Sequence, residues 1–332
     1  MRPCASELEY LQAGCVVCDL SDRYSVLEAV GPDARAFLHG QLSSDVAGLG
    51  AEHVQLSTYN TPKGRVLATL LLWRLGENIL LQMPASTAAS IAKRLSMFVL
   101  RSKVRLTVSE RFVRFGLTGA TAAQTLAAAG IAVPDTDFGL VTAAASGAPG
   151  APDGSLRLPG ARYQLLFSDS ERAIALWQQL LSAGAHIGNG AAWQWASIRS
   201  GIAEIVAETQ DQFVPQMLNY DVLDGVSFTK GCYPGQEIVA RTQYLGEIKR
   251  RTLLLHAQIQ DAPVPAQSVH ALSSPNQPIG MVLGAAAAPG GGYDVLACVH
   301  LDLAGGSDLR LGGADGPALH RLELPYALLA SR

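Results

Sequence analysis

The sequence predicts an α+β protein in which a long region of alternating strands and helices precedes a small all-β domain. The chain has 332 residues, of which 48% are hydrophobic and 16% charged, so it can bury more than one core. Apolar residues at strand and helix spacing alternate from residue 15 to about residue 201. After Arg251, short apolar runs separated by glycine- and proline-rich turns indicate a closed or sandwiched β domain.

The first elements follow from apolar spacing and turn residues. Strands are expected at "CVVCDL" and "YSVLEAVG", and a helix at "GPDARAFLHGQL" with Pro32 in its first turn. The strands "VQLSTYN" and "RVLATLLLWR" flank a turn at Thr61–Gly64, and "ILLQM" is a further strand. The next helix, near residues 86–98, is expected to bury Ile91, Leu95 and Phe98 on its apolar face.

The remaining elements divide the chain into two domains. Strands and helices alternate to about residue 129, and the breaker-rich residues 143–155 predict a surface loop. The strand "YQLLFS" is followed by helices that end at Gly184 and Gly201. Short strands are then expected at "TLLLHAQI", "IGMVLGAAA", "YDVLACVHLDL" and "LHRLEL". We therefore expect domains at 1–243 and 244–332.

Composition excludes several classes of protein. The net charge of −3 gives no general reason to expect nucleic-acid binding. The most apolar stretch, "VLATLLLWRLGENILLQM", is interrupted by Arg74 and Glu77, and the first residues lack the apolar region of a secretory signal. We expect a cytoplasmic protein that does not enter a membrane.

The cysteines and histidines do not predict a metal site. Cys15 and Cys18 form a C-x-x-C, but the stretch has strand composition, and residues three apart on a strand point to opposite faces. No second C-x-x-C is present, and the seven histidines are scattered. We interpret this pair as structural.

The stretch "FTKGCYPGQEIVART", residues 228–242, is the strongest candidate for chemistry. In an extended chain Lys230 and Cys232 share a face, and Pro234 fits the first turn of the helix that follows. The ammonium group and the helix dipole would both lower the pKa of the thiol. Gly231 and Gly235 leave the backbone open to close approach by another molecule.

The rest of the motif is expected to support this thiol. Tyr233, Gln236 and Glu237 would fix the loop and the helix start by hydrogen bonding, and Arg241 follows on the same helix. The alternative is a buried structural cysteine in a tight turn, which is the commoner role of an isolated cysteine.

Residues 213–251, "FVPQMLNYDVLDGVSFTKGCYPGQEIVARTQYLGEIKRR", resemble the signature of the YgfZ family, the folate-binding branch of the glycine-cleavage T-protein superfamily. The K-G-C-Y-x-G-Q-E motif of that family is complete here. Weaker similarities at "VGPDARAFLHGQLSSDV", "NTPKGRVLATLLLWR" and "IGMVLG" extend the resemblance over nearly the whole chain.

The resemblance implies two interleaved α/β subdomains that hold tetrahydrofolate, followed by a β-barrel. It also implies a role in making or repairing iron–sulfur enzymes, including those that modify tRNA. Aromatic rings at Tyr24 and Trp193 would flank the folate, although both also suit an ordinary core. The complete set of folate-contacting positions implied by the resemblance is Tyr24, Asn60, Trp193, Arg199, Gln216 and Asn219.

The sequence departs from the aminomethyltransferases of this superfamily. Their hairpin aspartate is replaced by an aliphatic side chain, Leu67 or Ala68, and an aliphatic group cannot act as a general base. Arg199 stands where the superfamily often has a pterin-binding glutamate, and Glu204 is the nearest substitute. The alternative is that Arg199 is an exposed residue in the last turn of its helix, where its charge suits the C-terminal dipole. Residues 241–251 carry a net charge of +3, from four cations and one anion, and suit either the glutamyl tail of a folate or a solvated linker.

Two other functions stay open at this point. A folate-dependent one-carbon (aminomethyl) transferase is disfavoured by the missing carboxylates. An RNA-binding module is disfavoured by the acidic net charge and by the lack of a basic surface interleaved with aromatic residues.

Overall fold

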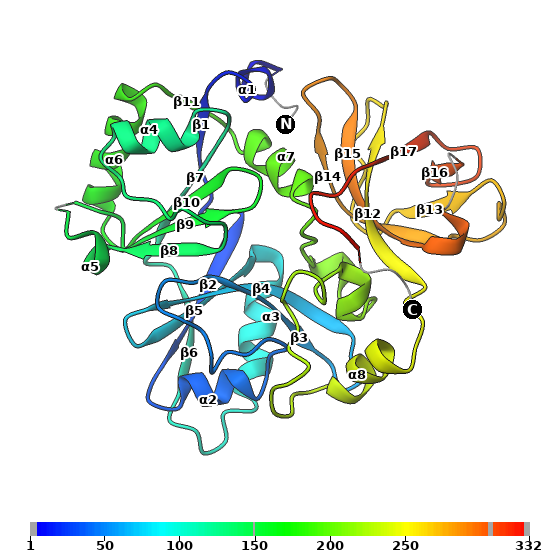
Figure 1. Cartoon of the computed structure of the whole chain (residues 1–332), viewed down its shortest axis with the longest axis horizontal. Helices are drawn as coiled ribbons and strands as arrows, with labels where there is room; N and C mark the ends of the chain where they lie inside the picture. Colours follow the sequence, from blue (N-terminus) through cyan, green and yellow to red (C-terminus); the bar gives the residue numbers. More distant parts are fainter. Residues whose placement is uncertain (1–4, 149, 305–307, 329–332) are drawn as a thin grey trace. The chain divides into compact units, whose positions relative to one another are not determined.

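The computed structural model describes residues 5–148, 150–304 and 308–328 (Figure 1). The chain divides into two compact units. Unit 1 consists of Met1–Phe37, Ala47–Gln55 and Leu71–Ala196, and unit 2 of Leu38–Val46, Leu56–Leu70 and Ser197–Arg332. Two short N-terminal segments thus belong to the unit that contains the C-terminal half. The boundary expected near residue 244 coincides with the end of helix α8 (Gln236–Tyr244) and lies inside unit 2, so the compact units follow a different division.

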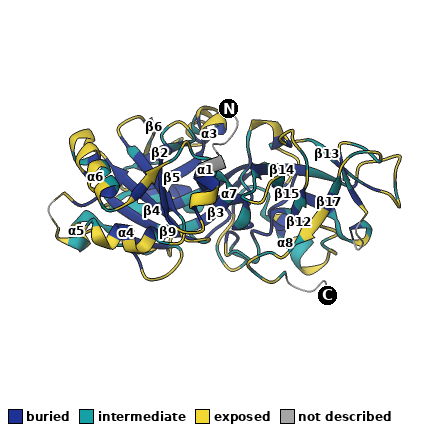
Figure 2. Ribbon diagram, turned by 90° about the horizontal axis from the view of Figure 1, so that it is seen from above, coloured by how far each residue is buried: buried dark blue, intermediate teal, exposed yellow. Residues whose placement is uncertain are grey.

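Unit 1 contains a six-stranded sheet. Its strand order is β11 (Ala185–Ile187), β1 (Cys15–Asp19), β7 (Val113–Thr118), β10 (Arg162–Phe167), β9 (Gly154–Leu158) and β8 (Gly139–Thr142). Only the pairing of β1 with β11 is parallel among these strands. Helices α4 (Ala122–Ala128) and α6 (Ser170–Ser182) bury apolar side chains in the cluster on one side of the sheet. In Figure 2 the strands are mostly buried, whereas the outer sides of these helices are exposed.

The predicted opposite orientation of Cys15 and Cys18 on β1 is confirmed. Cys15 packs with Leu126 and Leu176 in the core beneath α4 and α6. Cys18 belongs to a second core, which it shares with Trp73 of strand β4 (Val66–Leu75). Neighbours on opposite faces of one strand thus fill separate cores.

The second sheet has the order β3 (Gln55–Asn60), β4, β5 (Asn78–Pro84), β2 (Tyr24–Val30) and β6 (Arg105–Ser109). The segment that joins β3 and β4 is the predicted turn, closed by a hydrogen bond of 2.9 Å from Gly64 N to Thr61 O. Helix α3 (Ala85–Ser96) buries Ile91 and Leu95 as expected, but the prediction for Phe98 is wrong. Phe98 lies beyond the helix end and is 46% exposed, because the helix stops at Ser96 although the apolar spacing continues to residue 98.

Shorter helices complete the two units. They are α1 (Ala5–Tyr10), α2 (Ala34–His39), α5 (Ala143–Ser146), α7 (Ala191–Arg199), η1 (Ala207–Thr209) and η2 (Pro215–Leu218). Helix α5 lies within the predicted surface loop at 143–155. Pro32 precedes α2 instead of occupying its first turn. No described helix is long and apolar enough to cross a membrane.

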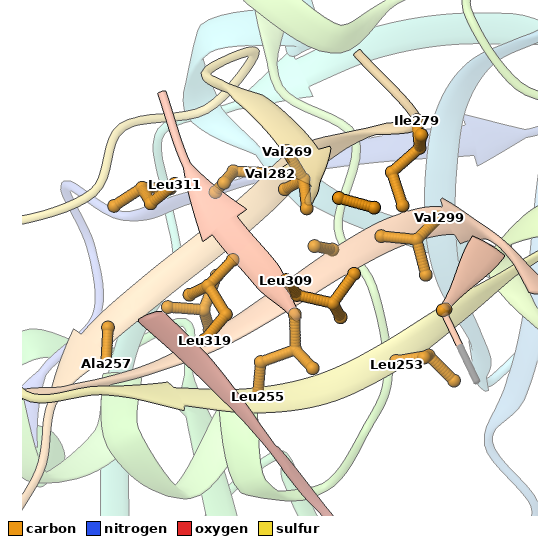
Figure 3. Close-up of a cluster of buried hydrophobic side chains, with 14 of the residues drawn as sticks. Leu253, Leu255, Ala257, Val269, Ile279, Val282, Val299, Leu309, Leu311 and Leu319 are labelled. Atoms are coloured by element: carbon orange, nitrogen blue, oxygen red, sulfur yellow. The ribbon is translucent and has the colours of Figure 1, made fainter. Parts of the chain in front are cut away.

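The C-terminal part of unit 2 is a closed barrel, as the resemblance implied. Its strands follow the order β12 (Arg250–Ala257), β15 (Tyr293–His300), β14 (Gly280–Ala287), β13 (Ser268–Ala271), β16 (Leu309–Leu311) and β17 (Ala318–Leu322). The turn η3 (Leu301–Leu303) follows β15. Figure 3 shows inward side chains such as Leu255, Val282 and Leu319 meeting in the interior. Strands β13 and β16, which the sequence did not predict, close the barrel.

Candidate functional site

The motif at residues 228–242 is a loop followed by helix α8, within unit 2. The predicted helix is present, but it begins at Gln236, so Pro234 lies before it and not in its first turn. Gly235 is the N-cap, with a left-handed φ of 80°. Helix α8 buries Val239 and exposes Glu237 and Arg241.

The two motif glycines have different surroundings. A Cβ atom at Gly235 would lie 2.5 Å from Thr61 O and 2.6 Å from Gly64 Cα. The backbone that approaches Gly235 is therefore the β3–β4 turn of the same chain, and the left-handed φ adds a second reason for glycine. A Cβ atom at Gly231 would meet nothing within 4 Å, so the backbone beside Cys232 is open.

The thiol of Cys232 is exposed, unlike the other described cysteines. Burial raises the pKa of Cys15 to about 11 and the pKa values of Cys18 and Cys298 to about 12. Those thiols therefore stay protonated and enclosed at neutral pH. Cys4 lies outside the described residues. Cys232 is thus the described thiol that can meet a partner molecule.

Lys230 is directed toward the backbone of a neighbouring segment. Its Nζ donates hydrogen bonds to the carbonyl oxygens of His39, Leu42 (2.7 Å) and Ser44 (2.9 Å). The same Nζ lies 5.1 Å from the centre of the Tyr233 ring. Burial lowers the pKa of Lys230 to about 8, while Asp45 acts in the opposite direction. The three carbonyl acceptors also favour the charged ammonium.

The side chains of Tyr233, Gln236 and Glu237 form no supporting hydrogen bond around the thiol in the described part of the chain. The Tyr233 hydroxyl is buried without a partner, and burial raises its pKa to about 12. The side chains of Gln236 and Glu237 form no hydrogen bond with other described residues. The backbone does form one hydrogen bond between these residues, from Gln236 N to Tyr233 O at 3.2 Å, so the helix start is closed by the backbone and not by side chains. The loop is held by Lys230 and by backbone packing at Gly235.

Three amide side chains that the resemblance implied as folate contacts are buried in unit 2. Gln216 Nε2 donates to Val239 O at 2.7 Å, and Asn219 Nδ2 donates to Thr252 O at 2.8 Å. These two amides join η2 to α8 and to β12. Asn60, at the end of β3, is 2% exposed, and neither its Nδ2 nor its Oδ1 has a hydrogen-bond partner among the described residues. Asn60 is therefore the amide most in need of a ligand.

Tyr24 and Trp193 lie together in a core of unit 1. They are 3% and 1% exposed, and Trp193 Nε1 donates to the Tyr24 hydroxyl at 3.3 Å. The guanidinium carbon of Arg162 lies 5.4 Å from the centre of the indole ring. A Cβ atom at Gly116 would lie 2.6 Å from Cε3 of the same ring. Both aromatics have the core role that the sequence allowed, and their contact with folate stays a prediction.

Arg199 is the last residue of α7, and it faces the barrel. Its Nη1 lies 3.8 Å from Oδ2 of Asp294, which is almost fully buried. The other oxygen of this carboxylate is 2.9 Å from Nδ1 of His256. Arg199 therefore belongs to a charged cluster on β12 and β15, and its contact with folate also stays a prediction.

The basic segment at residues 241–251 is smaller than the sequence indicated. Arg251 is buried and forms a bidentate pair with Asp221, with nitrogen–oxygen distances of 2.5 and 2.9 Å. Its charge is therefore not available to a folate tail, which corrects the count made from sequence. Lys249 lies 3.9 Å from Glu247 at the surface. Sequence reasoning missed Asp221, because an isolated aspartate in "NYDVLDG" carries no pattern that points to its partner.

No group of three or more potential metal-ligating side chains occurs among the described residues. The chemistry available in this part of unit 2 is that of one accessible thiol, one enclosed ammonium and one unpaired amide. All three are set on segments that pack against one another: the motif loop, residues 39–44 and β3 with its turn.

Comparison with known proteins gives the family. No family model matches the chain. The tRNA-modifying protein YgfZ of Edwardsiella ictaluri (strain 93-146) is 31% identical over 307 residues, which cover 92% of this chain and 91% of that protein. The YgfZ protein of Yersinia enterocolitica (serotype O:8, biotype 1B) is 30% identical over 311 residues, with the same coverage.

Among solved structures, the glycine cleavage system aminomethyltransferase T from Bartonella henselae has the same fold. The TM-score is 0.77 at 19% identity, over 97% of this chain and 89% of that chain. At this identity the likeness shows the fold alone. These relatives match the chain over most of their length, and its K-G-C-Y-P-G-Q-E block is intact on a T-protein fold. The chain therefore belongs to the YgfZ family.

Proposed function

We propose that the protein is a tetrahydrofolate-binding accessory protein for the assembly or repair of iron–sulfur enzymes, including enzymes that modify tRNA, and that it works in the cytoplasm. The observation that carries the proposal is the exposed thiol of Cys232 in the intact family motif. A thiol reacts only where it is accessible and able to ionise, and the other described cysteines meet neither condition. The name of the relatives, tRNA-modifying protein, supports the link to tRNA modification.

Asn60 supports the folate part of the proposal. Its unpaired amide offers one acceptor and two donors at a buried position. A pterin ring carries donors and acceptors side by side along one edge, so it can satisfy both ends of such an amide. Tetrahydrofolate supplies a carrier for one-carbon units when it is bound. Asn60 would hold and orient the ring, and pairing its amide would remove the cost of a buried unsatisfied group.

The β3–β4 hairpin does not support aminomethyl transfer. Leu67 and Ala68 lie on β4, and the sequence from His53 to Gly76 contains no carboxylate. An aliphatic side chain neither accepts a proton nor stabilises a developing iminium charge. We therefore expect no methylene-tetrahydrofolate from tetrahydrofolate and an aminomethyl donor above an uncatalysed control, and measurable turnover would reject this part of the proposal.

The role of the thiol is tested in cells that lack their native YgfZ protein. Cys232→Ala should fold, since it removes a small exposed side chain, but it should not restore the activity of iron–sulfur enzymes. The matched control is Cys298→Ala, which removes a buried thiol from the barrel and should restore activity fully. Restoration by Cys232→Ala would show that the thiol is dispensable. Circular dichroism and urea denaturation of both variants separate loss of function from loss of fold.

Folate binding is tested by calorimetry with Asn60→Leu. Leucine has a similar volume and no polar atoms, so the variant loses no protein hydrogen bond and should be at least as stable as the wild type. Its affinity for tetrahydrofolate should fall by about tenfold or more, because the amide then contributes neither donor nor acceptor. Unchanged affinity with unchanged stability would exclude Asn60 from the folate site.

A further inference from the structure

The ammonium group of Lys230 is fully occupied by the protein backbone. A lysine ammonium has three N–H donors, and here three carbonyl oxygens accept them, from His39, Leu42 and Ser44. All three acceptors lie on one short stretch, residues 39–44, which we call the serine segment. No donor remains for a thiolate at Cys232. The arrangement resembles a cation site built from carbonyl oxygens, with the lysine as its cation.

The serine segment is also tied to the start of the motif loop. Ser43 Oγ donates to Gly225 O at 2.6 Å, and Ser227 N donates to Ser43 O at 2.9 Å. Ser43 is fully buried, so these hydrogen bonds are shielded from water. Lys230 adds the third attachment, closest to Cys232. The loop that carries the thiol is thus fastened along its length to one segment.

The opposite side of the serine segment is held by β3. Thr58 N donates to Ser43 Oγ at 2.8 Å, and Ser44 N donates to Ser57 Oγ at 3.2 Å. Strand β3 ends at Asn60, whose amide has no hydrogen-bond partner among the described residues. A continuous set of hydrogen bonds therefore connects the strand that ends at Asn60 with the loop that carries Cys232.

We propose that Lys230 is a positioning residue: its ammonium clamps the motif loop onto the serine segment and thereby fixes the place of Cys232, and it does not pair with the thiolate. The consequence for activity rests on the proposed role of Cys232. The clamp itself is a property of the folded chain, and it can be tested without any folate or client enzyme.

The first test uses Lys230→Ala and amide hydrogen exchange. We expect exchange at Ser44, Thr58 and Ser227 to become about tenfold faster or more, because the loss of three hydrogen bonds loosens the segment locally. Butylammonium, which has three N–H donors on an alkyl stem, should restore the protection. Tetramethylammonium, which has the charge but no donors, should not. Unchanged exchange in the variant would overturn the clamp.

The second test separates the clamp from a thiolate partner. The rate of Cys232 alkylation by iodoacetamide is measured against pH in the wild type and in Lys230→Met. A clamp predicts that the midpoint of the profile stays in place. A direct partner predicts that it moves upward by about one pH unit or more, because the thiolate loses a stabilising charge. That upward shift would overturn the proposal.

The third test uses the wild-type chain, so it does not depend on a variant that folds. Acetylation with acetic anhydride near neutral pH should modify the exposed Lys63 and Lys249 well before Lys230. Protection of Lys230 supports an enclosed ammonium with no free donor. Because the pKa of Lys230 is lowered to about 8, its rate is compared with that of an exposed amine of the same pKa. Acetylation of Lys230 at the full rate of such an exposed amine would show that the three carbonyl oxygens do not hold it, and would overturn the clamp.

Discussion

Replacing Gly235 by alanine should separate helix α8 from the β3–β4 turn. The added Cβ would lie 2.5 Å from Thr61 O, 2.6 Å from Gly64 Cα and 2.7 Å from Gly64 N. All three neighbours are backbone atoms in a tight turn, so none can move aside by a change of rotamer. Gly235 also has a φ of 80°, a conformation that alanine disfavours.

The size of the effect follows from these two terms. The left-handed conformation costs an alanine about 1–2 kcal/mol. Forcing a methyl group into an occupied space typically costs about 1–3 kcal/mol. The lower entropy of alanine in the unfolded chain returns about 0.4–1 kcal/mol. We therefore expect the free energy of unfolding to fall by about 1–4.5 kcal/mol.

The assay is urea denaturation of the variant beside a matched control in the same motif. Gly231→Ala adds the same methyl group where no atom lies within 4 Å, and Gly231 does not have a positive φ. The control should change stability by about 0.5 kcal/mol or less. Equal stability of Gly235→Ala and the wild type would refute the packing argument. A loss of the same size in both variants would show that the effect is not specific to the turn.

Four further predictions concern other contacts of the two units. Arg251→Met should lower the free energy of unfolding by about 3–5 kcal/mol, because it leaves the fully buried carboxylate of Asp221 unpaired, and the double variant Arg251→Met with Asp221→Leu should recover most of that loss in urea denaturation. Tyr326→Phe should cost about 1–2 kcal/mol in the same assay, because its hydroxyl forms hydrogen bonds of 2.7 and 3.1 Å. Trp193→Ala should cost about 3–5 kcal/mol, as for a large core residue, and unchanged tetrahydrofolate affinity in that variant would exclude it as a contact. Because burial lowers the pKa of Lys230 to about 8, the unfolded chain binds this proton more tightly between about pH 8 and its ordinary value of 10.5, so stability should rise with pH over that range in the wild type relative to Lys230→Met.

Apolar periodicity was sufficient to predict most elements of the fold. The strand at Cys15–Asp19, with its two cysteines on opposite faces, follows directly from the alternation of a strand. Phe98 was misplaced because its spacing continues the helix pattern, whereas the chain leaves the helix at Ser96. The barrel strands Ser268–Ala271 and Leu309–Leu311 are too short to show any period, and only pairing with their neighbours defines them.

At the candidate site, local sequence predicted the exposed thiol and the helix after it, but not the partners. The acceptors of Lys230 lie near residue 40, far from it along the chain, and they are backbone carbonyl oxygens that every residue type possesses. The neighbour of Gly235 is likewise backbone, at Thr61 and Gly64. A pattern of side chains in the sequence therefore does not predict these backbone contacts. The ion pair of Arg251 with Asp221 was missed for a related reason, because charge counting treats every arginine in a basic run as exposed.

The structure also changes how the motif is explained residue by residue. Chemistry alone would assign Lys230 to activate the thiol and Gly235 to admit another molecule. In the folded chain both residues hold the loop instead, Lys230 through three carbonyl oxygens and Gly235 through close packing on the β3–β4 turn. Gly231 and Cys232 remain open to solvent in the loop, as Glu237 and Arg241 do on helix α8. A motif this specific can therefore consist mainly of residues that fix a backbone, with its reactivity confined to one side chain. On this view, substitutions at Lys230 and Gly235 should impair function because they displace Cys232. The same substitutions should be tolerated if other contacts hold the loop in place.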